Sequence, residues 1–299
     1  MRNLLLVFLS LVLSSCQSNF IKAIYNFRAQ TPAPIKKDIK VALVLGGGGS
    51  RSIAQIGVIE ILEKNGIKAD LIIGTSGGSI IGALYADSAD IETVKKIGLN
   101  FKRADILNLS LKNAIEGARS LRGGFDGSSA EKFIEQNLKA QDFNQLKIPF
   151  IAVATDINSG QTVELRSGKI APSVRASCAI PGLFSPVEIY GMTLVDGGVT
   201  APLAIDIAKS YRPKLIIAVD VSLSLKKDKV QNMLELVHRS ALLSYNALNE
   251  LNGKRADILI KPYLEDVGIF DDHKNEEIYN AGKLEAEKYI KQIKAKLKK

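Results

Sequence analysis

From Ile39 onward, short runs of apolar and β-branched residues alternate with stretches in which apolar residues recur at helical spacing. The apolar runs at residues 40–45 and 71–75 predict strands that are buried on both faces. Helical patterns follow these runs at residues 53–64 and from Ser79 to about Tyr85. This order predicts a β-α-β-α unit.

Further along the chain, apolar runs at residues 149–156, 215–221 and 257–261 predict three more buried strands. Helical spacing predicts helices at residues 229–251 and 276–297. Strands that alternate with helices form parallel sheets covered by helices on both faces. We therefore predict a three-layer α/β fold with a mostly parallel central sheet.

The first residues have the pattern of a signal peptide. Arg2 precedes an apolar run at residues 4–13, and Ser14, Ser15 and Cys16 follow. The run is about half the roughly 20 residues that a membrane-spanning helix needs. Residues 13–16 resemble the lipobox of bacterial lipoproteins, in which the chain is cleaved before the cysteine and that cysteine carries the lipid. An ordinary secretory signal with a chance cysteine is the alternative.

This pattern predicts three regions. Residues 1–15 form the signal peptide, residues 16–38 form a lipidated tether that is polar and contains prolines, and residues 39–299 form the catalytic domain. A lipid on Cys16 would place the protein in the bacterial cell envelope, and the outer membrane of a Gram-negative cell is favoured over the inner membrane. Cys178 is the only other cysteine, so a disulfide framework is excluded.

The charge and composition limit the classes of partner. Lys and Arg number 40 against 31 for Asp and Glu, which gives a formal net charge of +9 and favours an anionic partner. The chain has no zinc-ligand spacing, no basic-region heptads and no tryptophan, so membrane phospholipid is favoured over nucleic acid. No pattern for a cofactor or a metal is present, and the sequence does not indicate an oligomeric state.

The segment from Gly74 to Gly78 fits the G-x-S-x-G pattern of a nucleophile elbow, with Ser76 as the nucleophile. It lies between a predicted strand and a predicted helix, as this sharp turn requires. The flanking glycines leave room for the strained turn and for the attacking oxygen. A glycine-rich connection without catalytic function is the alternative interpretation of this segment alone.

Four consecutive glycines at residues 46–49 follow the first predicted strand, with Ser50 and Arg51 after them. Their backbone N–H groups could converge on an anion. A dinucleotide-binding loop is disfavoured, because the G-x-G-x-x-G pattern fails in both frames. An oxyanion hole explains these glycines together with the elbow. Arg51 could steady the loop, attract lipid phosphate or simply be solvated.

A serine nucleophile needs a base, and the sequence offers two kinds. The chain has two histidines, His238 and His273, and the order of Ser76, Asp196 or Asp220, and His273 permits a triad. A triad is disfavoured because only one strand precedes the glycine run, whereas several strands precede the elbow of an α/β-hydrolase. The other kind is a carboxylate, and Asp196 stands between a short apolar run and two glycines.

These motifs resemble the three signatures of the patatin-like phospholipase family, in the order found in that family, and the resemblance is strong from about Val41 to Pro202. The resemblance implies a patatin-like fold and a Ser–Asp dyad, with Ser76 as nucleophile and Asp196 as base. It carries over the remaining site residues as follows: Gly47, Gly48 and Gly49 as the oxyanion hole, and Gly74, Gly78, Arg51, Gly197 and Gly198 as motif residues. One departure is Ser52, which occupies the position of a family glycine.

The resemblance implies hydrolysis of acyl esters of phospholipids or lysophospholipids through an acyl-enzyme. Two alternatives remain open at this point: acyl transfer to an acceptor other than water, and a non-catalytic surface lipoprotein that binds lipid. Residues 109–129 are rich in Gly, Ser and Arg, and we expect them to form a flap near the site.

Overall fold

The structure is a computed structural model, and it describes residues 23–25, 32, 34–107, 124–223 and 229–298. The predicted signal peptide, Cys16 and most of the predicted flap at residues 109–129 lie outside the described residues. Within the described part of the chain, no helix combines the length and apolarity needed to cross a bilayer.

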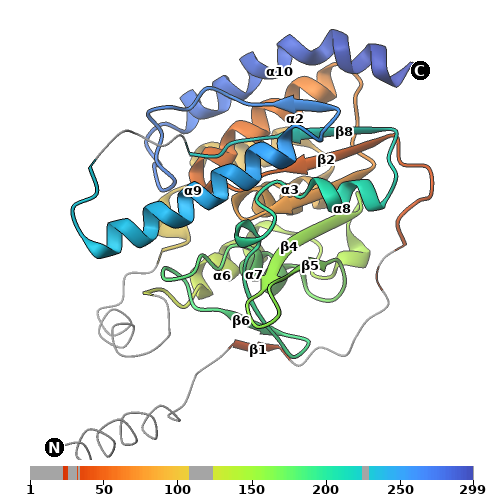
Figure 1. Cartoon of the computed structure of the whole chain (residues 1–299). Helices are drawn as coiled ribbons and strands as arrows, with labels where there is room; N and C mark the ends of the chain where they lie inside the picture. The colour runs from red at the N-terminus through yellow and green to blue at the C-terminus, as the bar shows by residue number, and fades with distance from the viewer. Residues whose placement is uncertain (1–22, 26–31, 33, 108–123, 224–228, 299) are drawn as a thin grey trace, which may run out of the picture.

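Five parallel strands form the centre of the fold, in the order β4, β3, β2, β8, β9 (Figure 1). Their bounds are Val41–Leu45 for β2, Leu71–Thr75 for β3, Phe150–Asp156 for β4, Leu215–Val219 for β8 and Ile258–Ile260 for β9. All residues of β2, β3, β4 and β8 are buried, which explains their continuous apolar sequence. The five strands predicted from the sequence are confirmed.

A smaller antiparallel region extends the sheet beyond β4. It contains β5 (Gln161–Leu165), β6 (Val187–Ile189) and β7 (Met192–Asp196), and both β5 and β7 pair with β4. The sequence pattern did not predict β5 and β6 as strands, because they are short and only partly buried. Strand β1 (Ala23–Tyr25) pairs with β6, so part of the segment predicted to be a tether adds to the sheet.

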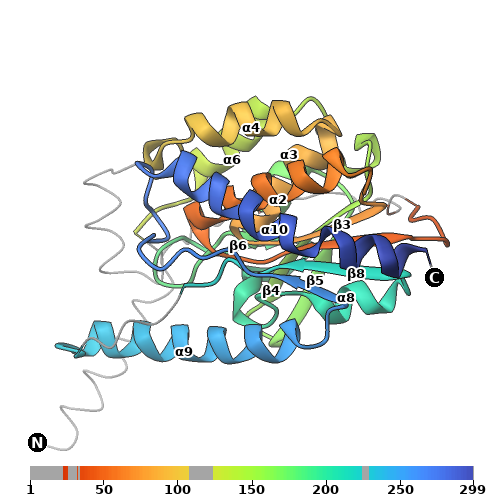
Figure 2. The ribbon, with the colours of Figure 1, turned by 90° about the horizontal axis from the view of Figure 1, so that it is seen from above.

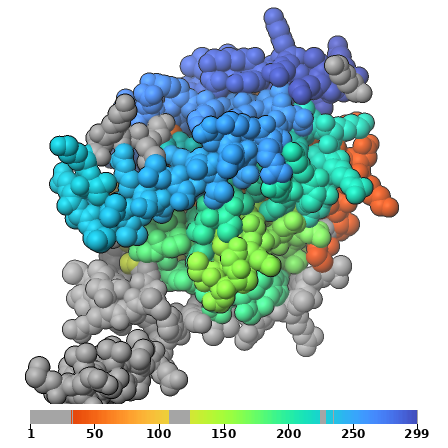
Figure 3. Space-filling model, in the orientation of Figure 1, coloured from red at the N-terminus to blue at the C-terminus, as the bar shows by residue number. Residues whose placement is uncertain are grey.

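Helices cover both faces of the sheet, which confirms the predicted three-layer α/β fold (Figures 1 and 2). Helices α8 (Ile205–Ser210) and α9 (Met233–Gly253) lie on one face. Within the described residues, the helices on the other face are α2 (Ile53–Lys64), α3 (Gly77–Ser88), α4 (Ile91–Asn100), α6 (Ser128–Asn137), α7 (Ile170–Ser177) and α10 (Asn275–Leu297). Helix α9 runs across the surface of the molecule (Figure 3).

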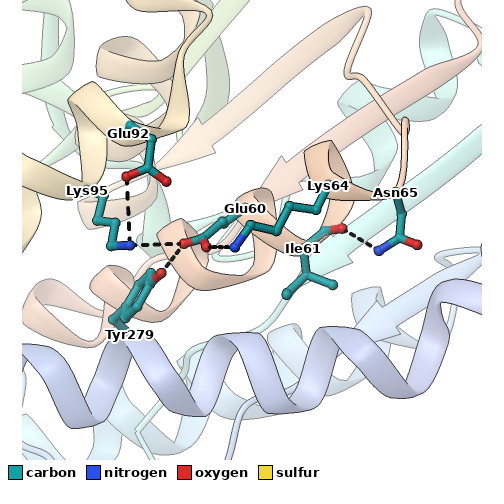
Figure 4. Close-up of polar contacts among 7 residues, drawn as sticks. All are labelled: Glu60, Ile61, Lys64, Asn65, Glu92, Lys95 and Tyr279. Atoms are coloured by element: carbon teal, nitrogen blue, oxygen red, sulfur yellow. Dashed lines mark hydrogen bonds and ion pairs between the residues drawn. The ribbon is translucent and has the colours of Figure 1, made fainter.

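Helix α10, the longest in the described part of the chain, packs closely on α2. A Cβ atom at Gly57 would collide with the Tyr279 carbonyl oxygen, and one at Gly282 would collide with the Ala54 carbonyl oxygen, so glycine on each helix permits this approach. The buried carboxylate of Glu60 accepts hydrogen bonds from Tyr279 on α10 and from Lys64 (Figure 4). The contact between these helices is thus both apolar and polar.

Candidate active site

Ser76 occupies the turn between β3 and α3, with φ 53° and ψ −128°. A positive φ is unusual for a residue with a side chain, and the surrounding contacts hold this conformation. The Ser76 N–H donates to Ser177 Oγ at 3.0 Å, and the Ser76 carbonyl oxygen accepts from Ser79 Oγ at 2.6 Å. The Ser177 hydroxyl in turn donates to the Val153 carbonyl oxygen at 2.6 Å, which fastens the turn to β4.

The elbow glycines are required by close approach of the backbone. A Cβ atom at Gly74 would lie 2.6 Å from the Gly78 carbonyl oxygen, and a Cβ atom at Gly78 would collide with the Leu45 carbonyl oxygen. Since atoms cannot approach this closely, a side chain at either position would displace α3 from β2 or β3. The turn that presents Ser76 therefore depends on both glycines.

The glycine run after β2 passes directly beside Ser76. The Gly47 N–H donates to the Pro202 carbonyl oxygen at 3.1 Å, so it is engaged within the fold and is not available to an oxyanion. This corrects the prediction for Gly47. The N–H groups of Gly48 and Gly49 have no hydrogen-bond acceptor within the described residues. Gly49 has φ 58°, and a Cβ atom there would collide with the Ile269 carbonyl oxygen.

Asp196 ends β7 and is 5% exposed, beside Ser76, which is 8% exposed. Its Oδ1 atom accepts the Gly198 N–H at 2.7 Å, and its Oδ2 atom is buried with no hydrogen-bond partner among the described residues. Burial raises the pKa of Asp196 to about 6, although the nearby Ser76 hydroxyl and the Gly198 N–H each lower it. A buried carboxylate with one oxygen unoccupied is suited to accept a proton from Ser76.

Two further contacts fix the backbone around Asp196. A Cβ atom at Gly197 would collide with the Val153 carbonyl oxygen, and one at Gly198 would lie 2.6 Å from the ring of Tyr245. Tyr245 comes from α9, and its hydroxyl donates to the Gly47 carbonyl oxygen at 2.7 Å. Tyr245 therefore joins the glycine run to the segment that carries the acid. No local sequence motif indicated Tyr245.

Arg51 is a structural residue of the site. Its buried guanidinium donates to four carbonyl oxygens, those of Val221, Ser222, Leu264 and Val267, at 2.5–2.7 Å. Burial lowers the pKa of Arg51 to about 10, so it remains charged at neutral pH. Of the three interpretations considered, the structure supports the one in which Arg51 steadies the glycine run.

The alternative acid and bases lie apart from Ser76. Asp220 is buried in an ion pair with Lys261 at 2.8 Å, and its Oδ1 atom accepts the Ser222 N–H. The side chain of His273 is 92% exposed beside Asp272, and His238 is exposed on α9. Neither histidine contacts Ser76 or Asp196 among the described hydrogen bonds, so a triad finds no support.

Ser76 lines an apolar cavity. Apart from the elbow and the glycine run, its walls are mainly aliphatic and aromatic, and they include Ile80, Leu84, Phe101, Phe133 and Phe184. Helices α3, α4, α6 and α7 supply part of this lining. A cavity with few polar groups accepts a flexible hydrocarbon chain.

Ser52 is one of the residues that line this cavity, and it directly precedes α2. It is 2% exposed, and its hydroxyl neither caps α2 nor has any hydrogen-bond partner among the described residues. A Cβ atom built on Gly77 would lie 2.5 Å from Ser52 Oγ and 3.1 Å from the Gly49 nitrogen. Ser52 Oγ is therefore close to Gly77, the residue that follows the nucleophile.

The geometry combines a strained serine, a buried carboxylate, available N–H groups and an apolar cavity, which together suit nucleophilic attack on the ester of a long acyl chain. The family model of the patatin-like phospholipases matches residues 43–209. The chain belongs to the patatin-like phospholipase family.

Individual relatives agree with this assignment. The chain is 34% identical to human patatin-like phospholipase domain-containing protein 6 over 183 residues, which is 60% of this chain and 13% of that protein. It is 30% identical to Lysophospholipase NTE1 of Scheffersomyces stipitis over 277 residues, or 84% of this chain and 18% of that protein. The chain thus spans less than a fifth of the length of either relative. The crystal structure of VipD from Legionella pneumophila aligns with 90% of this chain and 72% of its own, at 12% identity and a TM-score of 0.49.

Proposed function

We propose that this protein is a serine acyl hydrolase that cleaves fatty-acyl esters of phospholipids or lysophospholipids with a dyad of Ser76 and Asp196. The observation that carries the proposal is the buried, unpartnered Oδ2 atom of Asp196 beside a serine on a strained elbow. The apolar cavity at Ser76 provides the space for the acyl chain. The names of the relatives, a phospholipase and a lysophospholipase, agree with this substrate class.

The first half of the reaction forms an acyl-enzyme. Ser76 Oγ attacks the ester carbonyl carbon while Asp196 Oδ2 accepts the hydroxyl proton. The C=O π bond opens and gives a tetrahedral oxyanion. When the carbonyl re-forms, the bond to the alcohol part of the lipid breaks, and that alcohol leaves with the proton from Asp196. The acyl group remains on Ser76.

The second half releases the fatty acid. Asp196 Oδ2 accepts a proton from water, and the water oxygen attacks the acyl carbon. The collapse of this second tetrahedral species breaks the bond to Ser76 Oγ, which recovers its proton from Asp196. The raised pKa of Asp196 supports this role, since an aspartate of ordinary pKa is a weaker base.

The N–H groups of Gly48 and Gly49 are the proposed oxyanion donors, because neither has an acceptor within the described residues. They lie at the start of η2 (Gly49–Ser52), and Gly77, the first residue of α3, lies close to Gly49. In other acyl-transfer enzymes one such donor contributes about 3–4 kcal/mol of transition-state stabilisation.

Substitution of the dyad tests the proposal. We expect Ser76→Ala and Asp196→Asn each to reduce ester hydrolysis at least about a thousandfold, because each removes a group on which every turnover depends. His273→Ala is the matched control and should retain full activity. The assay is fatty-acid release from diacyl phospholipids, lysophospholipids and short-chain esters, with circular dichroism to verify folding. Loss of activity in His273→Ala would contradict the dyad.

A further inference from the structure

Helix α9 carries its apolar side chains on the outside of the molecule. Six of the ten large apolar side chains that are exposed within the described residues lie between Val230 and Leu251. Met233 is 73% exposed, Val237 60% and Leu243 53%. The residues of α9 that share this outward side, here called the outer stripe, are Met233, Leu236, Val237, Ser240, Leu243, Ser244, Ala247 and Leu251.

The outer stripe follows helical spacing. The exposed Glu250, seven residues after Leu243, lies at its edge in an ion pair with Lys254. It extends for about 27 Å at 1.5 Å per residue. Its polar members are small, and the Ser240 hydroxyl is already satisfied by donation to the Leu236 carbonyl oxygen at 2.8 Å. A solvent-exposed apolar surface of this length marks an interaction site.

The inward side of α9 makes polar contacts with the domain beside the half-buried Leu242 and Leu248, and these contacts fix the orientation of the helix. Tyr245 donates to the Gly47 carbonyl oxygen, and Asn246 donates through Nδ2 to the Leu223 carbonyl oxygen at 2.9 Å. Asn249 is buried. The helix therefore cannot turn its apolar side inward without breaking its contact with the active-site glycine run.

The position and charge of α9 indicate what covers the outer stripe. The N-terminal half of the helix extends past the ends of the strands, at the same end of the molecule as the loop before α10 (Figures 1 and 2). That loop supplies Ile269 to the glycine run and Phe270 to the cavity. The exposed Lys229 lies four residues before the first residue of the helix. Apolar side chains beside lysines are typical of helices that lie in an anionic lipid interface.

We infer that the outer stripe of α9 inserts into the surface of an anionic phospholipid bilayer and so places the active site at the membrane. The inference rests on the proposed function in one respect: a lipid hydrolase favours a lipid surface over a protein as the partner of the outer stripe. It adds a second point of attachment, made by the folded domain itself, to the attachment predicted at Cys16.

A fluorescent label on the stripe tests insertion at the proposed position. In the full chain carrying Cys16→Ser, an environment-sensitive label at Leu243→Cys should shift to the blue with vesicles of phosphatidylglycerol and phosphatidylethanolamine, and brominated lipids should quench it. Leu284→Cys on α10 is the matched control, because Leu284 is 65% exposed on the opposite face of the sheet. We expect no shift there, whereas equal responses from both positions, or from neither, would overturn the inference.

A kinetic comparison separates docking from chemistry. The triple variant Met233→Ser, Val237→Ser and Leu243→Ser removes only exposed apolar groups, so we expect hydrolysis of vesicle lipid to fall roughly tenfold or more. Hydrolysis of a soluble short-chain ester should stay unchanged. If the wild type hydrolyses neither substrate, the proposed function fails, while vesicle hydrolysis that is unaffected by the triple variant overturns docking alone. The wild type could instead form a dimer in light scattering that the triple variant loses, with no response of either to vesicles. That result would overturn membrane docking and would assign the outer stripe to contact with a second copy of the chain.

A separate observation concerns Ser52, whose buried hydroxyl has no partner among the described residues and lies close to Gly77 and Gly49. A buried hydroxyl without a hydrogen bond costs stability, so its presence in the cavity points to a ligand. We propose that Ser52 Oγ donates a hydrogen bond to the oxyanion of the acyl-transfer intermediate, together with the N–H groups of the glycine run. This proposal rests on the proposed function and names a further catalytic residue for it.

Ser52→Ala separates a catalytic hydroxyl from a structural one. We expect kcat to fall about tenfold or more with little change in KM, while the free energy of unfolding is unchanged or higher. Ser173→Ala is the matched control, because the buried Ser173 hydroxyl donates to the Lys169 carbonyl oxygen at 2.8 Å. It should lose stability and keep kcat. An unchanged kcat in Ser52→Ala would overturn the role of Ser52, and an inactive wild type would instead overturn the proposed function.

Discussion

Asp196 is the residue on which the proposed chemistry and the stability of the fold make opposite demands. Burial raises the pKa of its carboxyl group to about 6, from an ordinary value of 3.8. The ionised form that serves as a base is therefore the form that burial disfavours. Two measurable consequences follow, one for activity and one for stability.

The first consequence concerns the pH dependence of activity. Because the base must be deprotonated in the free enzyme, kcat/KM should fall as the pH decreases through the pKa of Asp196, with an acid limb near pH 6. A profile from pH 4 to 8 on a soluble short-chain ester measures this limb without interference from lipid charge. A limb near pH 4 would indicate an ordinary, solvated aspartate and would contradict the desolvated site.

The second consequence concerns stability. A carboxyl group whose pKa is higher in the folded state stabilises the fold only while it is protonated, and this contribution is lost between about pH 4 and pH 6. Asp196→Asn removes the buried charge, so the free energy of unfolding at pH 8 should rise by about 1–3 kcal/mol. The gain should vanish near pH 4. Urea unfolding at the two pH values measures it, and Asp38→Asn, on an exposed side chain, should change neither value.

At the residue scale, sequence reasoning identified the residues that belong to compact motifs. Ser76 and Asp196 were predicted from the glycines beside them, and the structure places both in the site. The engagement of the Gly47 N–H by Pro202 and the contact of Tyr245 with Gly47 were not predicted. These contacts join residues far apart in the chain, and no local pattern encodes them.

At the element scale, the contact between α2 and α10 depends on one buried carboxylate. Burial alone would raise the pKa of Glu60, but hydrogen bonds from Lys64 and Tyr279 and the charge of Lys95 outweigh it and hold the pKa below its ordinary value (Figure 4). The ionised carboxylate therefore stabilises the contact above the unfolded-state pKa, and this stabilisation is lost as the pH falls.

Glu60→Gln keeps the shape of the side chain and removes its charge. We expect the free energy of unfolding at pH 7 to fall by about 1–3 kcal/mol, because the buried carboxylate loses its charge and its charge-assisted hydrogen bonds to Lys64 and Tyr279. Glu92→Gln is the control, since Glu92 is 65% exposed in its ion pair with Lys95 and should change stability by less than about 0.5 kcal/mol. Urea titrations of both variants provide the test, and equal effects would show that burial does not govern this cluster.

The elements that the sequence predicted well are those covered on both sides. Strands β2 and β3 and helix α2 were located within one residue of their bounds, because their apolar runs are uninterrupted. Strands β5 and β6 were missed because they are short and partly exposed. Helix α9 was predicted from its periodicity, but the periodicity of a helix does not tell which side faces solvent, and here the apolar side does.

At the scale of the whole molecule, Cys16 and α9 would hold the enzyme to a membrane by independent means. Cys16 would carry lipid on a tether, whereas the outer stripe would orient the folded domain. Palmitate labelling in a bacterial host should mark the full chain and should disappear in Cys16→Ser. Cys178→Ser is the control and should keep the label, and persistence of the label in Cys16→Ser would exclude the lipoprotein interpretation.

The left-handed backbone at Ser76 limits which amino acids this site can use. Threonine has the same reactive group, but β-branched side chains are disfavoured at positive φ, so a threonine would force the turn to open or the helix behind it to shift. Cysteine is unbranched and would fit the turn, yet its sulfur is larger and longer-bonded than the oxygen for which the glycine run is placed. The backbone at Ser76 therefore permits cysteine as a replacement nucleophile and disfavours threonine.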